Sequence, residues 1–394
     1  MVKATTIKVL KFGGSSLADD VGFRAACEKI KQQMQCAQVV VVVSARGHAT
    51  NLAQQQCDHY DANATEAAVL LATGEQASTA MFSAYLNQHH VPARSYQGWQ
   101  LPIMTNDQCM QAMIDSIDTT CLMDALARGM VPVVSGFQGV TPAGDVSTLA
   151  RGGSDTTAVA LAAVLGASEC LIYTDVPGVC TADPRRVSEA RVIDQLDYEV
   201  MLTMANMGAG VLSPRSVAMA KQYHVPLRVQ KTCSEQPGTQ VSRLVKSASM
   251  VEALAHMADL KSIKITHSSD YIADVLSSLS CFHVPMMTYE SRVGGHEVSV
   301  VMRADHGLCE SWRAMGYGVE VVEHVAMISL VGTMAQQESV LLQRVIKVLS
   351  DVTLLKWGMT ALKLTLVIPQ KHLDQVLNQL HIAFDLERSS SCIE

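Results

Sequence analysis

The sequence predicts an α/β protein in two parts, and three patterns support this prediction. A mostly apolar stretch from Ile7 to Phe12 runs into a glycine-rich turn and then a helical pattern. A second glycine pair, at residues 152–153, is followed by the polar residues SDTT and then by an apolar helical run. From about residue 250 onward the chain repeats a βαββ unit with a period of roughly 70 to 80 residues.

The first element is the strand predicted for Ile7–Phe12 (IKVLKF), followed at once by GGSS at residues 13–16. A strand, a glycine turn and a helix present backbone amides to a phosphate, and Lys11 places a cation beside them. The segment has neither the Walker ending nor a GxGxxG pattern, so it does not support those nucleotide folds. A tight turn beside a surface lysine is the alternative interpretation.

The next informative segment is the octet ARGGSDTT at residues 150–157, which precedes the apolar run AVALAAVLGA. The first amides of a helix lack internal partners, and the helix dipole favours an anion there. Arg151 adds a planar fork suited to a carboxylate or phosphate. A helix cap at Ser154 or Asp155 is the alternative, but it leaves the Arg-Gly-Gly unexplained.

A third segment, Leu171–Arg186 (LIYTDVPGVCTADPRR), begins as a strand and continues as a polar loop. Polar groups at strand ends commonly line the ligand crevice of an α/β sheet. With KFGGSS, TGEQ at residues 73–76, GFQG at 136–139, the octet and PLRV at 226–229, this segment resembles the aspartate kinases. The resemblance covers about residues 5–245.

The resemblance implies a three-layer sandwich amino acid kinase domain over residues 1–245 and two βαββ ACT-like α+β domains over residues 246–394. It implies transfer of the γ-phosphoryl group of ATP, with Mg²⁺, to the β-carboxylate of L-aspartate. The product is 4-phospho-L-aspartate, in the first step of aspartate-family amino acid biosynthesis. A carboxylate nucleophile is already ionised near neutral pH, so no general base is needed.

The resemblance also assigns roles to residues. Lys11 would bridge the phosphate and the attacking carboxylate, and Asp155 would orient that lysine and the metal-bound phosphates. Arg151 would pair with the α-carboxylate of aspartate and Glu75 with its ammonium group, while Thr50 and Ser154 match polar positions around the substrate. The positions that would bind ATP are Gly13, Gly14, Ser15, Ser16, Thr174, Asp175, Gly178 and Arg185. No protein residue is assigned as a metal ligand.

Two positions depart from the family pattern. Gly210 stands in GAGVLSPR where the family has a lysine that reaches the ATP phosphates, and Cys180 replaces a tyrosine that packs on the adenosine. Arg46, just before Gly47, is a candidate to compensate for the missing cation. These departures leave open weak ATP binding, another phosphoryl donor or a non-catalytic role.

Composition narrows the class of protein. At 394 residues, 48% hydrophobic and 17% charged, the chain predicts extensive burial that includes subunit contacts. Its longest apolar runs are too short to span a bilayer and its N-terminus lacks a signal-peptide core, so we expect a cytoplasmic protein without a membrane partner. The net charge of −7 without a basic run argues against nucleic acid. Eleven cysteines without a CxxC pair indicate reduced thiols.

The C-terminal part carries the expected ACT-like pair. We expect strands at 262–267, 285–290, 296–303, 319–331, 352–357 and 362–368, with helices at 271–282, near Trp312, at 339–349 and from Leu373. The loops HSSDY, GTMAQQES and DVTLLKW match an amino-acid effector site poorly. A scaffold for a homodimer or homotetramer is slightly favoured over a site for an unusual effector.

Three functions follow from these observations. An active aspartate kinase is the favoured hypothesis. A kinase for another amino acid, or a carbamate-type kinase of the same fold, fits TGEQ and RGGSD less well. A binding or regulatory protein with a degenerate kinase domain is the hypothesis that Gly210 and Cys180 support.

Overall fold

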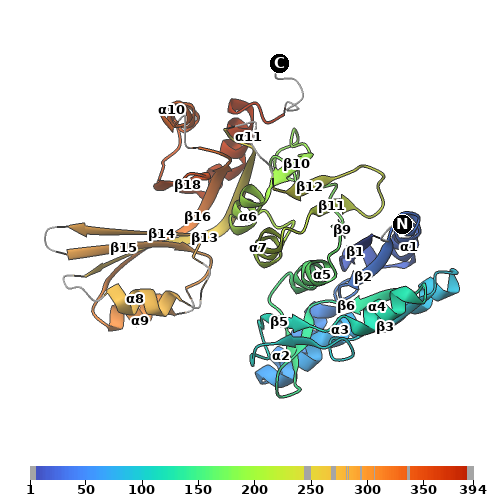
Figure 1. The fold of residues 1–394 in the computed structure, drawn as a ribbon. Coiled ribbons are helices and arrows are strands. Elements are labelled where there is room, and N and C mark those ends of the chain that lie inside the picture. Colours follow the sequence, from blue (N-terminus) through green and yellow to red (C-terminus); the bar gives the residue numbers. More distant parts are fainter. Residues whose placement is uncertain are drawn as a thin grey trace. The chain divides into compact units, whose positions relative to one another are not determined.

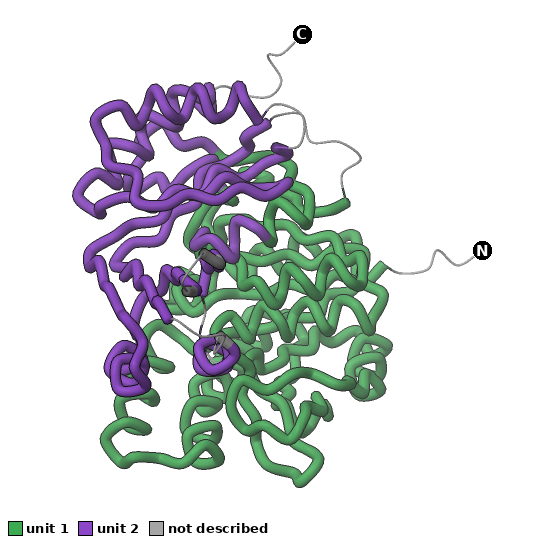
Figure 2. The backbone as a smooth tube through the Cα atoms, turned by 90° about the vertical axis from the view of Figure 1, so that its left-hand side faces the viewer, with its two compact units in different colours: residues 1–179, 192–202, 210–246 green, residues 180–191, 203–209, 247–394 purple. Residues whose placement is uncertain are grey.

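The computed structural model describes residues 6–243, 250–267, 272–280, 282, 284–292, 295–305, 307–334 and 338–387 (Figure 1). The chain divides into two compact units, shown in Figure 2. Unit 1 comprises Met1–Val179, Val192–Leu202 and Gly210–Lys246, and unit 2 comprises Cys180–Arg191, Thr203–Ala209 and Ser247–Glu394. Two short segments that precede residue 245 therefore group with the C-terminal part of the chain.

Unit 1 is built around an eight-stranded sheet in the order β10-β12-β11-β9-β1-β2-β6-β3. Its strand β1 (Ile7–Phe12) lies between β2 (Gln38–Val43) and β9 (Glu169–Thr174) and runs parallel to both. The other strands are β3 (Ala93–Tyr96), β6 (Val131–Ser135), β10 (Gln195–Asp197), β11 (Leu227–Lys231) and β12 (Thr239–Ser242). The carboxyl ends of the three central strands thus meet at one edge, where α/β sheets bind ligands.

Helices cover both faces of this sheet because side chains alternate along β1. Leu10 and Phe12 pack with α1 (Asp20–Met34) and α3 (Ala64–Gln88). Lys11 points to the opposite face, where it meets Asp155 on α5 (Gly153–Val164). The result is a helix–sheet–helix sandwich, and the predicted α/β class is confirmed.

The remaining elements of unit 1 surround this sandwich. A smaller sheet has the order β5-β4-β7-β8. Its strands are β4 (Ile103–Thr105), β5 (Ile114–Ile117), β7 (Gln138–Val140) and β8 (Val146–Thr148). The further helices are η1 (Ser15–Leu17), α2 (Ala49–His59), α4 (Thr120–Ala127) and α7 (Pro214–Tyr223). Helix α6 (Tyr198–Asn206) begins in unit 1, and its residues from Thr203 onward group with unit 2. No described helix is both long enough and apolar enough to cross a bilayer.

Unit 2 contains one six-stranded sheet in the order β14-β15-β13-β16-β18-β17. Its central pair, β13 (Ala253–His267) and β16 (Gly318–Val331), is antiparallel. The other strands are β14 (Met286–Arg292), β15 (Gly295–Met302), β17 (Lys356–Met359) and β18 (Lys363–Pro369). The helices are α8 (Ile272–Leu279), α9 (Leu308–Ala314), α10 (Glu338–Val348), η2 (Gln370–His372) and α11 (Leu373–Ala383).

The predicted βαββ repeat is present, and two of its strands begin four or more residues from the predicted start. Strand β13 begins at Ala253 rather than at residue 262, because Ala253 pairs with Val331 at the far end of β16. Strand β17 begins at Lys356 rather than at residue 352. Residues 244–249, which include the predicted domain boundary, and the effector-loop residues 268–271 and 335–337 lie outside the described part of the chain.

A buried aromatic cluster holds α1 and α3 against the main sheet. The ring of Phe82 is fully buried and meets Phe12 at 6.0 Å and Phe23 at 5.1 Å between centroids. We expect Phe82→Ala to lower the free energy of unfolding of unit 1 by about 3 to 5 kcal/mol, because it removes apolar burial and leaves a cavity. Urea unfolding followed by circular dichroism measures this change.

Tyr60→Ala is the matched control, since Tyr60 is 74% exposed. Its expected effect is within about 0.5 kcal/mol. Equal effects of the two substitutions would contradict the assignment of Phe82 to the core.

Candidate active site

The turn after β1 ties three segments together at the carboxyl edge of the sheet. The amide of Gly13 donates to the carbonyl of Tyr173 at 3.1 Å, and the amide of Gly47 donates to that of Gly14 at 3.1 Å. A Cβ at Gly14 would lie 2.4 Å from the carbonyl oxygen of Ala45. Glycine at this position therefore permits a close backbone approach.

Lys11 and Asp155 form a buried ion pair beside this turn. The amine of Lys11 lies 2.7 Å from Oδ1 of Asp155, and their side chains are 12% and 10% exposed. The same amine lies 3.6 Å from the position that a Cβ at Gly13 would take. The structure thus brings together the glycine turn, the predicted catalytic lysine and the predicted orienting carboxylate.

Helix α5 begins without a side-chain cap. Its N-cap residue is Gly152, with φ of 76° and no side-chain hydrogen bond at the cap. Ser154 and Asp155 lie inside the first turn and are each 7% exposed, so the cap interpretation of these two residues is wrong. Arg151 is exposed just before this helix, and within the described residues no carboxylate pairs with it. The arrangement leaves the first amides of α5 and a free guanidinium to meet an anion.

Glu75 is a buried carboxylate on α3. It is only 3% exposed, and its Oε2 atom has no hydrogen-bond partner among the described residues. Burial raises the pKa of Glu75 to about 7, although a backbone hydrogen bond at Ala45 and the charge of Lys11 oppose this shift. A cationic group placed against this carboxylate would therefore be strongly favoured. Thr50 is half-buried in the first turn of α2.

The predicted ATP-binding residues have differing surroundings. Ser15 is exposed, whereas the hydroxyl of Ser16 is buried and accepts a hydrogen bond from Thr232 at 2.6 Å. After β9, Thr174 donates to Asp175 at 3.0 Å. A Cβ at Gly178 would lie 2.7 Å from Oγ1 of Thr239, so this glycine allows close packing of the loop. Ser16 is thus held by the fold, and Ser15, Thr174 and Asp175 are the more accessible of these positions.

Arg185 belongs to unit 2, in the segment Cys180–Arg191. Its guanidinium donates to both carboxylate oxygens of Asp183, at 3.0 and 2.8 Å. This pair lowers the pKa of Asp183. Cys180 lies in the same segment, and burial raises the pKa of its thiol. The role of Arg185 toward a nucleotide stays a prediction.

Gly210, where the family has a lysine, and Arg46, the candidate to compensate for it, both belong to unit 1. Gly210 is exposed, has no left-handed φ, and a Cβ there would meet nothing within 4 Å. Glycine is therefore not required at this position by the backbone. The guanidinium of Arg46 donates to the carbonyl of Ala18 at 2.9 Å and lies 5.2 Å from the ring centre of Phe23.

A chain of buried polar groups behind Glu75 is not apparent from the sequence. Thr79 donates to the carbonyl of Glu75 at 2.6 Å and lies 2.7 Å from the hydroxyl of Ser135. Ser135 in turn donates to Oε1 of Gln97 at 2.5 Å. These residues come from separate elements, and only Thr79 carries a local signal, at i+4 from Glu75 on the same helix.

The raised pKa of Glu75 predicts a pH-dependent stability. The unfolded group titrates near its usual 4.5 and the folded group near 7, so ionisation opposes folding increasingly across this window and fully above it. We expect Glu75→Gln to gain about 2 kcal/mol of unfolding free energy relative to wild type between pH 5 and pH 8. Urea unfolding at both pH values checks this, with the exposed Glu66→Gln on the same helix as control. A difference that does not change with pH would contradict it.

The chain matches a known protein family and known relatives over most of its length. Residues 6–231 match the amino acid kinase family. The chain is 35% identical to an aspartokinase of Geobacillus stearothermophilus over 98% of this chain and 99% of that protein. It is 34% identical to aspartokinase 2 of Bacillus subtilis over 98% and 99% of the two chains.

Solved structures of aspartokinases have the same fold as this chain. Aspartokinase III of E. coli, in complex with aspartate and ADP, superposes with a TM-score of 0.83 at 25% identity, covering 96% of this chain and 100% of that one. The aspartate kinase of Clostridium acetobutylicum gives 0.74 at 19% identity, over 96% and 100%, and shows the fold alone. The sequence identity over nearly the whole chain and the shared fold lead to one assignment: the chain belongs to the amino acid kinase family, among the aspartokinases.

Proposed function

We propose that this protein transfers the γ-phosphoryl group of ATP to the β-carboxylate of L-aspartate, giving 4-phospho-L-aspartate. The observation that carries the proposal is the Lys11–Asp155 pair, held beside the glycine turn at the carboxyl edge of the sheet. Two anions must meet in this reaction, so a fixed cation between them supplies the main stabilisation. The names of the relatives support the choice of substrate.

The chemistry follows from the positions of the side chains. The β-carboxylate of aspartate attacks the γ-phosphorus, and ADP leaves with the bonding electron pair. Lys11 neutralises charge on the transferring group, and Asp155 fixes the direction of the lysine amine at 2.7 Å. The backbone amides of the turn at Gly13 and Gly14 donate to phosphate oxygens. The carboxylate is ionised near neutral pH, so no residue has to remove a proton.

In this proposal the protein binds both the α-carboxylate and the ammonium group of aspartate. The exposed guanidinium of Arg151 takes the α-carboxylate, and the buried carboxylate of Glu75 takes the ammonium group. Contact with an ammonium lowers the raised pKa of Glu75, so binding releases a proton when the pH is below about 7. The affinity for aspartate therefore rises with pH up to that value.

Mg²⁺ enters with the nucleotide. Within the part of the chain that the structure describes, no cluster of three His, Cys, Asp or Glu is arranged to hold a metal ion. Mg²⁺ usually keeps several waters and uses substrate phosphates with one or two carboxylates, so Asp155 beside the phosphate turn fits this mode. When bound, the ion would neutralise phosphate charge.

The proposal also covers the location of the enzyme, its oligomeric state and its division into domains. The resemblance supports a cytoplasmic homodimer or homotetramer that assembles through the ACT-like region. It also supports a division at residues 245–246 between the catalytic domain and the ACT-like region.

Trapping of the acyl phosphate tests the proposed function. The full chain is incubated with ATP, Mg²⁺, aspartate and hydroxylamine, and the hydroxamate is measured by its iron complex. Hydroxamate that requires both ATP and aspartate supports the proposal. Formation with glutamate or carbamate instead indicates another acid kinase, and ATP binding without turnover indicates a binding protein.

Arg151→Ala should separate aspartate binding from nucleotide binding. Losing one partner of a charge-assisted pair costs about 2 kcal/mol or more, which is a rise in the KM for aspartate of about 30-fold. The Kd for ATP should stay nearly unchanged, because Arg151 is assigned to the other substrate. Lys11→Ala is the contrasting variant and should lower kcat far more than it weakens binding. Equal losses of ATP and aspartate affinity in Arg151→Ala would exclude its assigned role.

Gly210→Lys should strengthen ATP binding. The backbone accepts a side chain there, and Arg46 is engaged with Ala18 and Phe23. A charge-assisted contact contributes about 1.5 kcal/mol or more, so the Kd for ATP should fall about tenfold. Calorimetry measures it, with the uncharged Gly210→Met as control. Tight ATP binding by the wild type, or an equal gain in both variants, would show that no cation is missing.

A further inference from the structure

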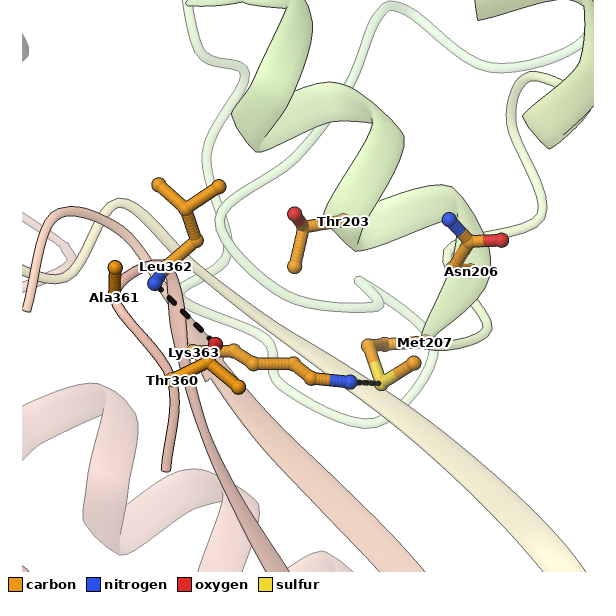
Figure 3. A pocket seen from close by; sticks show the side chains of 7 residues that line it. All are labelled: Thr203, Asn206, Met207, Thr360, Ala361, Leu362 and Lys363. Atoms are coloured by element: carbon orange, nitrogen blue, oxygen red, sulfur yellow. Dashed lines mark hydrogen bonds between the residues drawn. The ribbon is translucent and has the colours of Figure 1, made fainter. Parts of the chain in front are cut away.

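A pocket of about 280 Å³ is lined by residues of unit 2, and none of its lining residues is assigned to catalysis. Its walls are Thr203, Asn206 and Met207 from the end of α6, and residues 360–363 from the turn between β17 and β18. Figure 3 shows Lys363 extended across the pocket toward Met207. None of these lining residues carries a carboxylate, so nothing in the described wall repels an anion.

The amine of Lys363 makes only a weak hydrogen bond among the described residues. It donates to the thioether sulfur of Met207 at 3.1 Å, which is a weak acceptor. Among the described residues no carboxylate pairs with it. Half-burial without an ionic partner disfavours the ammonium form and lowers the pKa of Lys363. An amine in this condition spends more of its time neutral and nucleophilic than an exposed lysine does.

A structural role at the end of α6 does not account for this lysine. The last carbonyls of the helix are already taken by backbone amides: Met207 donates to Thr203 at 3.0 Å and Ala209 donates to Met204 at 3.0 Å. The charge of Lys363 is therefore not needed to satisfy the helix end.

We propose that Lys363 is a site of covalent acylation by small acyl phosphates, which enter the pocket between α6 and the β17–β18 turn. Asn206 and Thr360 line the same pocket and supply an amide and a hydroxyl as hydrogen-bond donors to the phosphoryl group. The neutral amine attacks the acyl carbon and forms an amide bond. The carbon–oxygen bond to phosphate breaks, inorganic phosphate leaves with the electron pair, and the proton of the amine passes to water.

The proposed function produces one member of this class, 4-phospho-L-aspartate. The inference itself requires only that an acyl phosphate reaches the pocket. Acetyl phosphate supplied from outside therefore tests the site whether or not the chain phosphorylates aspartate, and the two proposals can fail separately.

The chain contains two matched control lysines. Lys356 on β17 also has its pKa lowered by burial, but its amine is enclosed, without a hydrogen-bond partner in the described residues. The side chain of Lys31 on α1 is 41% exposed, and its amine contacts Glu28 at 3.2 Å. Lys356 tests whether burial alone suffices, and Lys31 gives the rate of an ordinary surface amine.

The full-length protein is incubated with acetyl phosphate, and peptide mass spectrometry follows the acetylated fraction of each lysine over time. We expect Lys363 to react several-fold faster than both: the pKa of Lys31 is raised rather than lowered, and the amine of Lys356 is enclosed instead of lining the pocket. A rate at Lys363 no greater than at Lys31 overturns the proposal. An equal rate at Lys356 also overturns it, because the cavity would then be irrelevant.

Ala361→Phe tests the pocket without altering the amine. Ala361 is exposed in the β17–β18 turn, so the new ring fills the pocket without entering the core. We expect acetylation of Lys363 to fall to the rate of Lys31, with an unchanged thermal unfolding curve. Unchanged acetylation of Lys363 in this folded variant would refute the pocket as the route. Lys363→Arg serves to confirm the assignment of the modified peptide.

Discussion

The ion pair between Lys11 and Asp155 is the interaction on which the arrangement of the candidate site depends. It joins the carboxyl end of the central strand β1 to the first turn of α5, two elements that lie far apart in the sequence. Both side chains are nearly buried, so removing one partner would leave an uncompensated charge. The pair therefore sets the position of a cation beside the glycine turn at Gly13. Strand alternation along β1 places this cation opposite the aromatic core.

Glu75 shows how the same fold creates affinity for a cation. The helix that carries it packs closely at Ala45, where a Cβ at Gly74 would lie 2.7 Å from the Cβ of Ala45. Water is thereby kept from the carboxylate, and its pKa rises to about 7. The polar chain through Thr79 and Ser135 holds the adjacent backbone in place. A site of this kind favours ligands that bring their own positive charge.

Pairing of strands β13 and β16 joins the two βαββ units of the C-terminal repeat. The two βαββ units do not form separate sheets, because β13 and β16 pair along most of their length. A separate core lies on each half of this shared sheet, one around Trp312 and one around Leu330. Segments 180–191 and 203–209 group with this unit, and the second of them supplies a wall of the Lys363 pocket. A short segment that precedes residue 245 thus completes a feature of unit 2.

The sequence by itself predicted the α/β class and the βαββ order, because glycine turns, helix starts and strand alternation are local patterns. Its motifs carried the resemblance to the aspartate kinases, and that resemblance singled out Lys11, Glu75, Arg151 and Asp155. Only the tertiary structure showed that Gly152, not Ser154 or Asp155, caps α5, since the choice depends on backbone conformation. The engagement of Ser16 with Thr232, the early start of β13 and the isolation of Lys363 were likewise decided there. Each depends on contacts between residues distant in the chain, and no local pattern encodes such contacts.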